Sequence, residues 1–271
     1  MIPDRFPEAT LPQMLRDNAR RHPDRIAIRQ KEFGIWNPCT WRWYFERARD
    51  VGLGFRALGL SAGGHVAILS ENRIEWVLAQ LGANVVDGIA VGVYPTSPSN
   101  EVAYVVAHSE AEVIVCEDQE QVDKVLERRD ELPKLRRIVV IETKGIRDYP
   151  PDQVMSFEAL EALGASEARA QAALVDGIVD RQQLSQIALI IYTSGSTGKP
   201  KGAMLSYGNI RAQAMAATDK LDLVSSDSML SYLPLCHVAE QMTTVMVPVY
   251  LGSLVNFGES IRTVQEDLRE V

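Results

Sequence analysis

Residues 65–95 read HVAILSENRIEWVLAQLGANVVDGIAVGVYP and change pattern twice. The run HVAIL is short and apolar, RIEWVLAQLGANVVD has apolar residues at helical spacing, and IAVGVYP is apolar again. A strand, a helix and a second strand in this order form the crossover unit that connects parallel strands. The stretch therefore predicts a parallel sheet covered by helices.

The alternation continues toward the C-terminus. A helix is expected in NEVAYVVAHS, a strand in EVIVC, a helix in DQEQVDKVLERRDEL and a strand in RRIVVIE. The next long stretch, ASEARAQAALVDGIVDRQQL, is helical in composition but polar, and we interpret it as a connection between two lobes. Near Gln186 the alternation resumes with the predicted elements IALIIYT, GAMLS, YGNIRAQAMAATDKL, SMLSYLP, AEQMTTVMVPVYLG and SLVNF.

These patterns predict an α/β fold with doubly wound, mostly parallel sheets and flanking helices. We expect an N-terminal α/β subdomain over residues 1–185 and the start of a second α/β subdomain over residues 186–271. The final segment, TVQEDLREV, looks helical but carries no glycine cap or following proline, so we interpret the second subdomain as truncated.

Composition limits the function classes. The chain has 271 residues, 46% hydrophobic content and a net charge of -8, with scattered basic residues, which argues against nucleic-acid binding. Its three cysteines lie far apart and show no metal-ligand spacing, so we expect a reducing cytoplasm and no metal site. No signal peptide and no membrane-spanning stretch is predicted.

The segment YTSGSTGKPKG, residues 192–202, directly follows the apolar run IALII. It is not a Walker loop, because Thr193 and Pro200 stand where that motif needs glycine and a hydroxyl residue. Pro200 predicts that the segment stays extended instead of opening a helix. The segment suits a polyphosphate, because it combines glycines that reach positive φ with several hydroxyls and two lysines. Each hydrogen bond to the charged phosphates would contribute about 1.5 to 3 kcal/mol to binding. The alternative is a mobile Ser/Gly loop.

Two motifs carry a resemblance to a known family. The segment IYTSGSTGKPKGAMLS resembles the signature loop of the AMP-forming adenylating superfamily, and YLPLCHVAEQ, residues 232–241, is similar to its next motif. Upstream, VAILSENRIEWVLAQLGA is similar to the long-chain fatty acyl-CoA synthetase branch. The resemblance covers nearly the whole chain and implies the N-terminal part of the acyl-CoA synthetase fold.

The resemblance also implies a reaction. In this family a carboxylate attacks the α-phosphate of ATP, pyrophosphate leaves, and coenzyme A captures the acyl-adenylate, usually with Mg²⁺. The residues that would then bind the β- and γ-phosphates are Thr193, Ser194, Gly195, Ser196, Thr197, Gly198, Lys199 and Lys201.

The second motif implies substrate-binding roles for His237 and Glu240, beside an acyl pocket. The family usually has arginine where this chain has Gln241, which leaves the partner of Glu240 open. The family's later motifs, including the catalytic lysine, have no counterpart here, so the catalytic residues are expected beyond Val271.

Other features have simpler interpretations. GLGFRA, residues 52–57, matches a dinucleotide fingerprint, but it follows a helical pattern and is interpreted as a small-residue packing face. The three other histidines, His22, His65 and His108, are interpreted as structural or exposed. Acid pairs such as Glu110 with Glu112 are interpreted as solvated charges.

We therefore predict the N-terminal part of an ATP-dependent long-chain fatty acid:CoA ligase, inactive by itself. One alternative is an adenylating enzyme for another carboxylic acid, and another is a non-catalytic polyphosphate-binding fragment. The expected small-molecule partners are a fatty acid, ATP, Mg²⁺ and coenzyme A. Peripheral contact with the inner face of a membrane would suit a lipid substrate, although no basic amphipathic helix requires it. Oligomeric state is not predicted.

Overall fold

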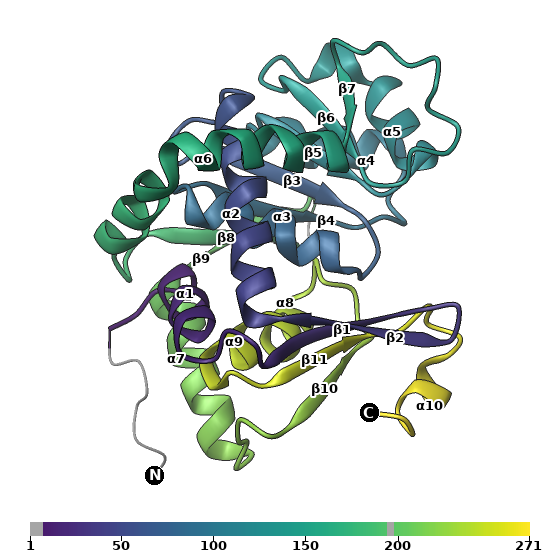
Figure 1. Cartoon of the computed structure of the whole chain (residues 1–271). Coiled ribbons are helices and arrows are strands. Elements are labelled where there is room, and N and C mark those ends of the chain that lie inside the picture. Colours follow the sequence, from purple (N-terminus) through teal and green to yellow (C-terminus); the bar gives the residue numbers. More distant parts are fainter. Residues whose placement is uncertain (1–7, 194–197) are drawn as a thin grey trace.

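The computed structural model describes residues 8–193 and 198–271. These residues form a seven-stranded sheet and a four-stranded sheet with helices around them (Figure 1). In the part of the chain described, no helix is both long and apolar enough to cross a bilayer.

The larger sheet has the order β7-β6-β5-β3-β4-β8-β9. Its pairs are parallel except for the antiparallel pair of β8 and β9 at one edge. This confirms the predicted mostly parallel α/β fold. The strands are β3 (His65–Leu69), β4 (Ile89–Val93), β5 (Val113–Cys116), β6 (Arg137–Val140), β7 (Val154–Ser156), β8 (Ile187–Thr193) and β9 (Lys201–Ser206).

Helices cover both faces of this sheet, which explains why β3 reads as an unbroken apolar run. Val66 and Ile68 belong to one buried cluster, whereas Ala67 and Leu69 belong to the other. The first face carries α2 (Trp41–Ala57), α3 (Ile74–Val85) and α6 (Phe157–Arg181), and the second carries α4 (Ser99–His108) and α5 (Gln119–Leu126), followed by the short η1 (Arg129–Glu131).

The smaller sheet combines the two ends of the chain. Its order is β10-β11-β1-β2, so that β1 (Ile26–Glu32) pairs in parallel with β11 (Leu254–Phe257). β10 (Ser228–Ser231) lies at one edge and β2 (Ile35–Thr40) at the other. The β1–β2 hairpin turns at Phe33 and Gly34, which both have positive φ (50° and 78°), as in a type I′ turn.

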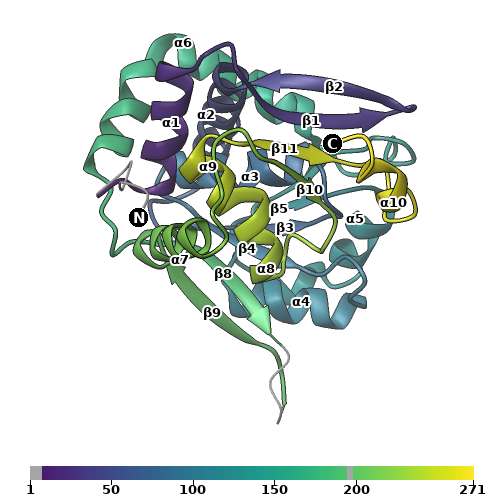
Figure 2. The same ribbon diagram turned by 90° about the horizontal axis from the view of Figure 1, so that it is seen from below.

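The remaining helices complete the packing around the sheets. Figure 2 shows α7 lying beside the connected helices α8 and α9, and α7 contacts α9. The core cluster that contains α1, α7 and α9 also includes Ile28 and Phe257 of the smaller sheet, so the buried core is continuous between the sheets. These helices are α1 (Leu11–Arg21), α7 (Tyr207–Lys220), α8 (Val238–Glu240), the π-helix η2 (Gln241–Met246), α9 (Val247–Leu251) and α10 (Val264–Asp267).

The predicted helix AEQMTTVMVPVYLG is broken into α8, η2 and α9. Pro248 explains the break, because it has no N–H and its ring would clash with the carbonyl of Thr244 in a regular α-helix. The wider π turn before α9 makes room for this ring. The helix ends at Gly252, whose φ is 72°, as a left-handed cap requires.

Two long-range features bear on the sequence interpretation. The predicted boundary between residues 185 and 186 does not separate the sheets, because β8 pairs with β4 in the larger sheet while β1 pairs with β11 in the smaller one. The division into subdomains therefore stays a prediction. The stretch interpreted as an inter-lobe connection is instead most of α6, which packs on α2 and joins β7 to β8 of one sheet. Its polar composition reflects its solvent face.

The small residues of α2 form a packing face, as predicted. A Cβ at Gly52 would lie 2.4 Å from the carbonyl oxygen of Gly82 in α3, and one at Gly54 would lie 2.5 Å from that of Leu160 in α6. Only glycine allows these backbones to approach so closely. The fingerprint-like sequence therefore serves helix packing.

Candidate functional site

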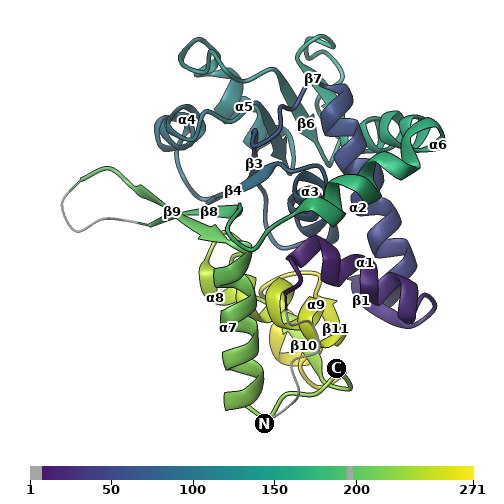
Figure 3. The same ribbon diagram turned by 90° about the vertical axis from the view of Figure 1, so that its left-hand side faces the viewer.

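The glycine-rich segment begins at the carboxyl end of β8 and returns as β9. Thr193 pairs with Lys201 in the antiparallel ladder, and both side chains are exposed. Figure 3 shows this end of the β8–β9 pair projecting from the body of the molecule, on the side where α4 lies. Of the predicted phosphate-binding residues, Ser194, Gly195, Ser196 and Thr197 lie outside the described residues.

The described end of the loop agrees with the local expectations from its sequence. Gly198 has a φ of 154°, and a Cβ at this position would meet nothing within 4 Å. A strand, not a helix, follows Pro200. Lys199 is exposed, with its Nζ 4.9 Å from the centroid of the Tyr104 ring in α4.

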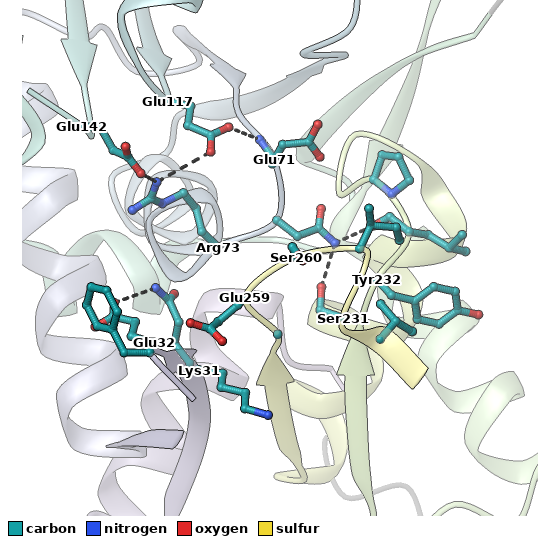
Figure 4. A pocket seen from close by; sticks show the side chains of 18 residues that line it. Lys31, Glu32, Glu71, Arg73, Glu117, Glu142, Ser231, Tyr232, Glu259 and Ser260 are labelled. Atoms are coloured by element: carbon teal, nitrogen blue, oxygen red, sulfur yellow. Dashed lines mark hydrogen bonds and ion pairs between the residues drawn. The ribbon is translucent and has the colours of Figure 1, made fainter. Parts of the chain in front are cut away.

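A pocket of about 1010 Å³ lies where the two sheets meet (Figure 4). Parallel α/β sheets bind ligands at the carboxyl ends of their strands. Most of the wall follows such ends: Glu71, Asn72 and Arg73 after β3, Glu117 after β5, Glu142 after β6, Tyr232, Leu233 and Pro234 after β10, and Gly258, Glu259 and Ser260 after β11. The β1–β2 turn closes one side.

Arg73 organises the charged part of this wall. Its guanidinium lies 2.8 Å from carboxylate oxygens of Glu75 and Glu142 and 3.8 Å from Glu117. Partial burial raises the pKa of Glu117, an effect that the N–H of Glu71 and the charge of Arg73 oppose. The ion pairs with Glu117 and Glu142 are visible in Figure 4.

Asn72 connects the larger sheet to the segment after β10. Its Nδ2 donates to the Ser231 hydroxyl at 2.9 Å, and its Oδ1 accepts from the N–H of Leu235 at 2.8 Å. The side chain therefore holds the YLPLCH motif against the end of β3. Gly92 of β4 completes this contact, because a Cβ there would lie 2.9 Å from Cα of Cys236.

Glu240, predicted to bind substrate, is fully buried and bound within the chain. Its carboxylate accepts from the Ser231 hydroxyl at 2.7 Å, from the N–H groups of Tyr232 and Leu233 at 3.2 and 3.1 Å, and from the Thr244 hydroxyl. The Glu240 carboxylate is thus bound by neutral donors, although the family usually has an arginine at the next position, Gln241. Glu240 shapes the pocket wall from behind.

His237 lies on the surface outside the pocket wall. It caps α8, where its Nδ1 accepts from the N–H of Ala239 at 3.2 Å. Gln241 is buried, accepting from Gln80 at 2.9 Å and donating to the carbonyl of Leu235 at 2.7 Å. Of the second motif, Tyr232, Leu233 and Pro234 face the pocket.

Sequence reasoning missed Asn72, Arg73 and Glu117. The available signal was their position, because each follows the apolar strands HVAIL or EVIVC within a few residues. It also treated Glu112 as solvated, whereas this carboxylate is buried and accepts from both the N–H and the hydroxyl of Ser61. Across residues 8–193 and 198–271, no group of three or more His, Cys, Asp or Glu side chains could hold a metal ion.

Comparisons with known proteins agree with this fold. The long-chain-fatty-acid–CoA ligase ACSBG2 of Xenopus laevis is 33% identical over 258 residues, which are 94% of this chain and 34% of the relative. That of Rattus norvegicus is 31% identical over 92% of this chain and 38% of its own length. The chain thus spans about a third of the length of the curated relatives it matches.

Solved structures show the same architecture. A long-chain-fatty-acid CoA ligase from Rhodopseudomonas palustris superposes with a TM-score of 0.77 at 23% identity, covering 96% of this chain and 60% of that one. The N-terminal domain of FACL13 from Mycobacterium tuberculosis gives 0.78 at 20% identity with the same coverage. The model of the AMP-binding enzyme family matches residues 15–270, and this chain therefore belongs to that family.

Proposed function

We propose that this chain forms the N-terminal part of an ATP-dependent fatty acyl-CoA ligase. The observation that carries the proposal is the position of the glycine-rich loop. In the sequence, its hydroxyls and lysines directly follow β8, a buried strand that is parallel to β4, and α/β proteins bind ligands at the carboxyl ends of such strands. The curated relatives named as long-chain-fatty-acid–CoA ligases support a fatty acid as the substrate.

In this proposal the loop binds the phosphates that leave as pyrophosphate. Lys199 and Lys201 are exposed and supply local positive charge at the end of the loop. The protein as a whole carries a net charge of -8, so an anion needs such local charge to bind. Placing such charge where negative charge develops is the main way in which proteins accelerate phosphoryl and adenylyl transfer. Coenzyme A is the proposed acceptor, and Mg²⁺ is proposed as a companion of ATP. A cytoplasmic location and contact with a membrane surface belong to the same proposal.

Pyrophosphate release tests the proposal. These 271 residues and the whole product of the gene that encodes them are each incubated with ATP, Mg²⁺, palmitate and coenzyme A. We expect release by the whole product only, and a loss of at least about tenfold on Lys199→Ala, because a charged contact to phosphate is worth about 1.5 to 3 kcal/mol.

Lys220→Ala is the matched control, because Lys220 is also exposed but lies at the far end of α7. Silence of the whole product with palmitate and with a panel of other carboxylates would refute the ligase assignment. Release only with a non-fatty acid would refute the substrate class alone. Equal activity of the Lys199 and Lys220 variants would remove Lys199 from the phosphate site.

A further inference from the structure

Helix α4 contacts both ends of the glycine-rich loop. On the returning side, the Tyr104 hydroxyl donates to the carbonyl of Pro200 at 3.1 Å, and Lys199 Nζ lies over the Tyr104 ring at 4.9 Å. On the outgoing side, the Tyr192 hydroxyl lies 2.7 Å from Nδ1 of His108. One turn of α4 therefore reaches the residues on either side of the loop.

The two contacts are also joined to each other. The rings of Tyr104 and His108 lie one helical turn apart, with centroids 5.3 Å from one another, and His108 meets the Tyr192 ring edge-on at 5.8 Å. Burial raises the pKa of Tyr192 to about 12, so its hydroxyl stays neutral beside Nδ1 of His108. The rings of Tyr104, His108 and Tyr192 therefore contact one another in a continuous row next to the ends of the loop.

The sheet does not position Lys199. The β8–β9 ladder ends at the pair Thr193 and Lys201, and β9 is an edge strand. Pro200, the next residue out, has no N–H with which to extend the ladder. Where the ladder stops, Pro200 and Lys199 both contact Tyr104.

We propose that Tyr104 is a positioning residue that holds the Lys199 ammonium at the loop for a bound polyphosphate. This inference rests on the proposed phosphate-binding function of the loop. An aromatic face attracts an ammonium without neutralising its charge, so the lysine remains available to an anion on its open side. Fixing the backbone at Pro200 and the side chain at Tyr104 reduces the ordering that binding would otherwise require.

A double-mutant cycle tests this role. Binding of inorganic pyrophosphate to the whole gene product is measured by calorimetry for the wild type, Tyr104→Leu, Lys199→Ala and the double variant. We expect Tyr104→Leu to weaken binding about fivefold, because the Lys199 side chain must then be ordered when pyrophosphate binds. In the Lys199→Ala background the same change should cost less than about twofold, because the group that Tyr104 positions is gone.

Two further variants make the result specific. Tyr104→Phe keeps the ring and loses only the bond to Pro200, so it should show an intermediate loss and serves if the leucine variant does not fold. Tyr149→Leu is the matched control, because the Tyr149 hydroxyl donates to Asp123 on α5, away from the loop.

The outcomes separate this inference from the proposed function. A wild-type protein that does not bind pyrophosphate would refute the phosphate-binding function and this inference with it. Tight wild-type binding that Tyr104→Leu leaves unchanged, or weakens equally with and without Lys199, would refute only the positioning role.

Discussion

Glu240 shows how a single side chain can serve a site without facing it. Its buried carboxylate is bound by two hydroxyls and two backbone N–H groups from the segment that lines the pocket and from η2. A buried charge needs such compensation, and oriented neutral donors can provide it as well as a cation does. The Glu240 carboxylate therefore has its hydrogen-bond donors even though position 241 is glutamine and not arginine.

Removing this carboxylate should destabilise the protein. Glu240→Ala leaves several buried donors without an acceptor, so we expect a loss of about 3 kcal/mol in the free energy of unfolding, measured with urea. Glu240→Gln, which retains one acceptor oxygen, should lose about half as much. Glu46→Ala, at an exposed position of α2, is the control and should change stability by less than about 0.5 kcal/mol. A cost no greater than that of the control would contradict this role.

Glu117 should make stability depend on pH. Burial raises the pKa of Glu117 in the folded protein above 4.5, its ordinary value. The stability that protonation of Glu117 contributes is therefore fully present below pH 4.5 and is lost as the pH rises through the folded pKa. Glu117→Gln mimics the protonated form at every pH. Its free energy of unfolding should therefore improve relative to the wild type between pH 4 and pH 7. A constant or reversed difference across this range would show that the carboxylate prefers its charged form in the folded protein.

At the scale of elements, close helix packing depends on glycines. α2 touches α3 through Gly52 and Gly82, and it touches α6 most closely at Gly164, where a Cβ would lie 1.6 Å from the carbonyl oxygen of Asp50. Helix propensity alone would favour alanine at such positions. The tertiary contact reverses that preference because the obstruction is backbone, which cannot rotate away.

Two substitutions in α6 separate these effects. Gly164→Ala should lower the free energy of unfolding by about 3 kcal/mol, because the helices must move apart. Gly177→Ala in the same helix meets only the end of the Arg181 side chain at 3.5 Å, so it should raise stability by about 0.5 to 1 kcal/mol. Urea unfolding of both variants checks this. Similar effects at the two positions would argue against close packing of α2 on α6.

At the scale of the whole molecule, ion pairs connect a strand near the N-terminus to the last helix of the chain. Lys31 in β1 lies 2.9 Å from Asp267 of α10 and 2.7 Å from Glu270, which also accepts from the Trp36 indole at 2.8 Å. Asp267 is fully buried. This cluster holds α10 beside the β1–β2 hairpin, next to the pocket.

Removing the cation should release this end of the chain. Lys31→Met leaves the Asp267 carboxylate buried without its lysine, so residues 258–271 should open more often. We expect trypsin to cleave after Arg262 several times faster than in the wild type, with little change in the melting temperature of the core. Lys220→Met provides a comparison at an exposed site. Unchanged cleavage would show that other contacts hold α10.

The sequence by itself determined the local units. The apolar, β-branched runs that became β3, β5, β6 and β8 were identifiable because strands buried on both faces carry almost no polar residues. The helices between them followed from their spacing, and the extended path after the glycine-rich loop followed from Pro200. The family assignment came from two contiguous motifs, since the residues of a binding loop lie next to one another in the chain.

Only the tertiary structure decided how distant segments meet. The pairing of β1 with β11 joins residues more than two hundred positions apart, and no local pattern states which sheet a strand enters. The same is true of α6 packing on α2, of Arg73 contacting carboxylates from two distant segments, and of Tyr104 reaching Lys199. Local propensity acts over a few residues, whereas these contacts exist only after the chain has folded and buried its core.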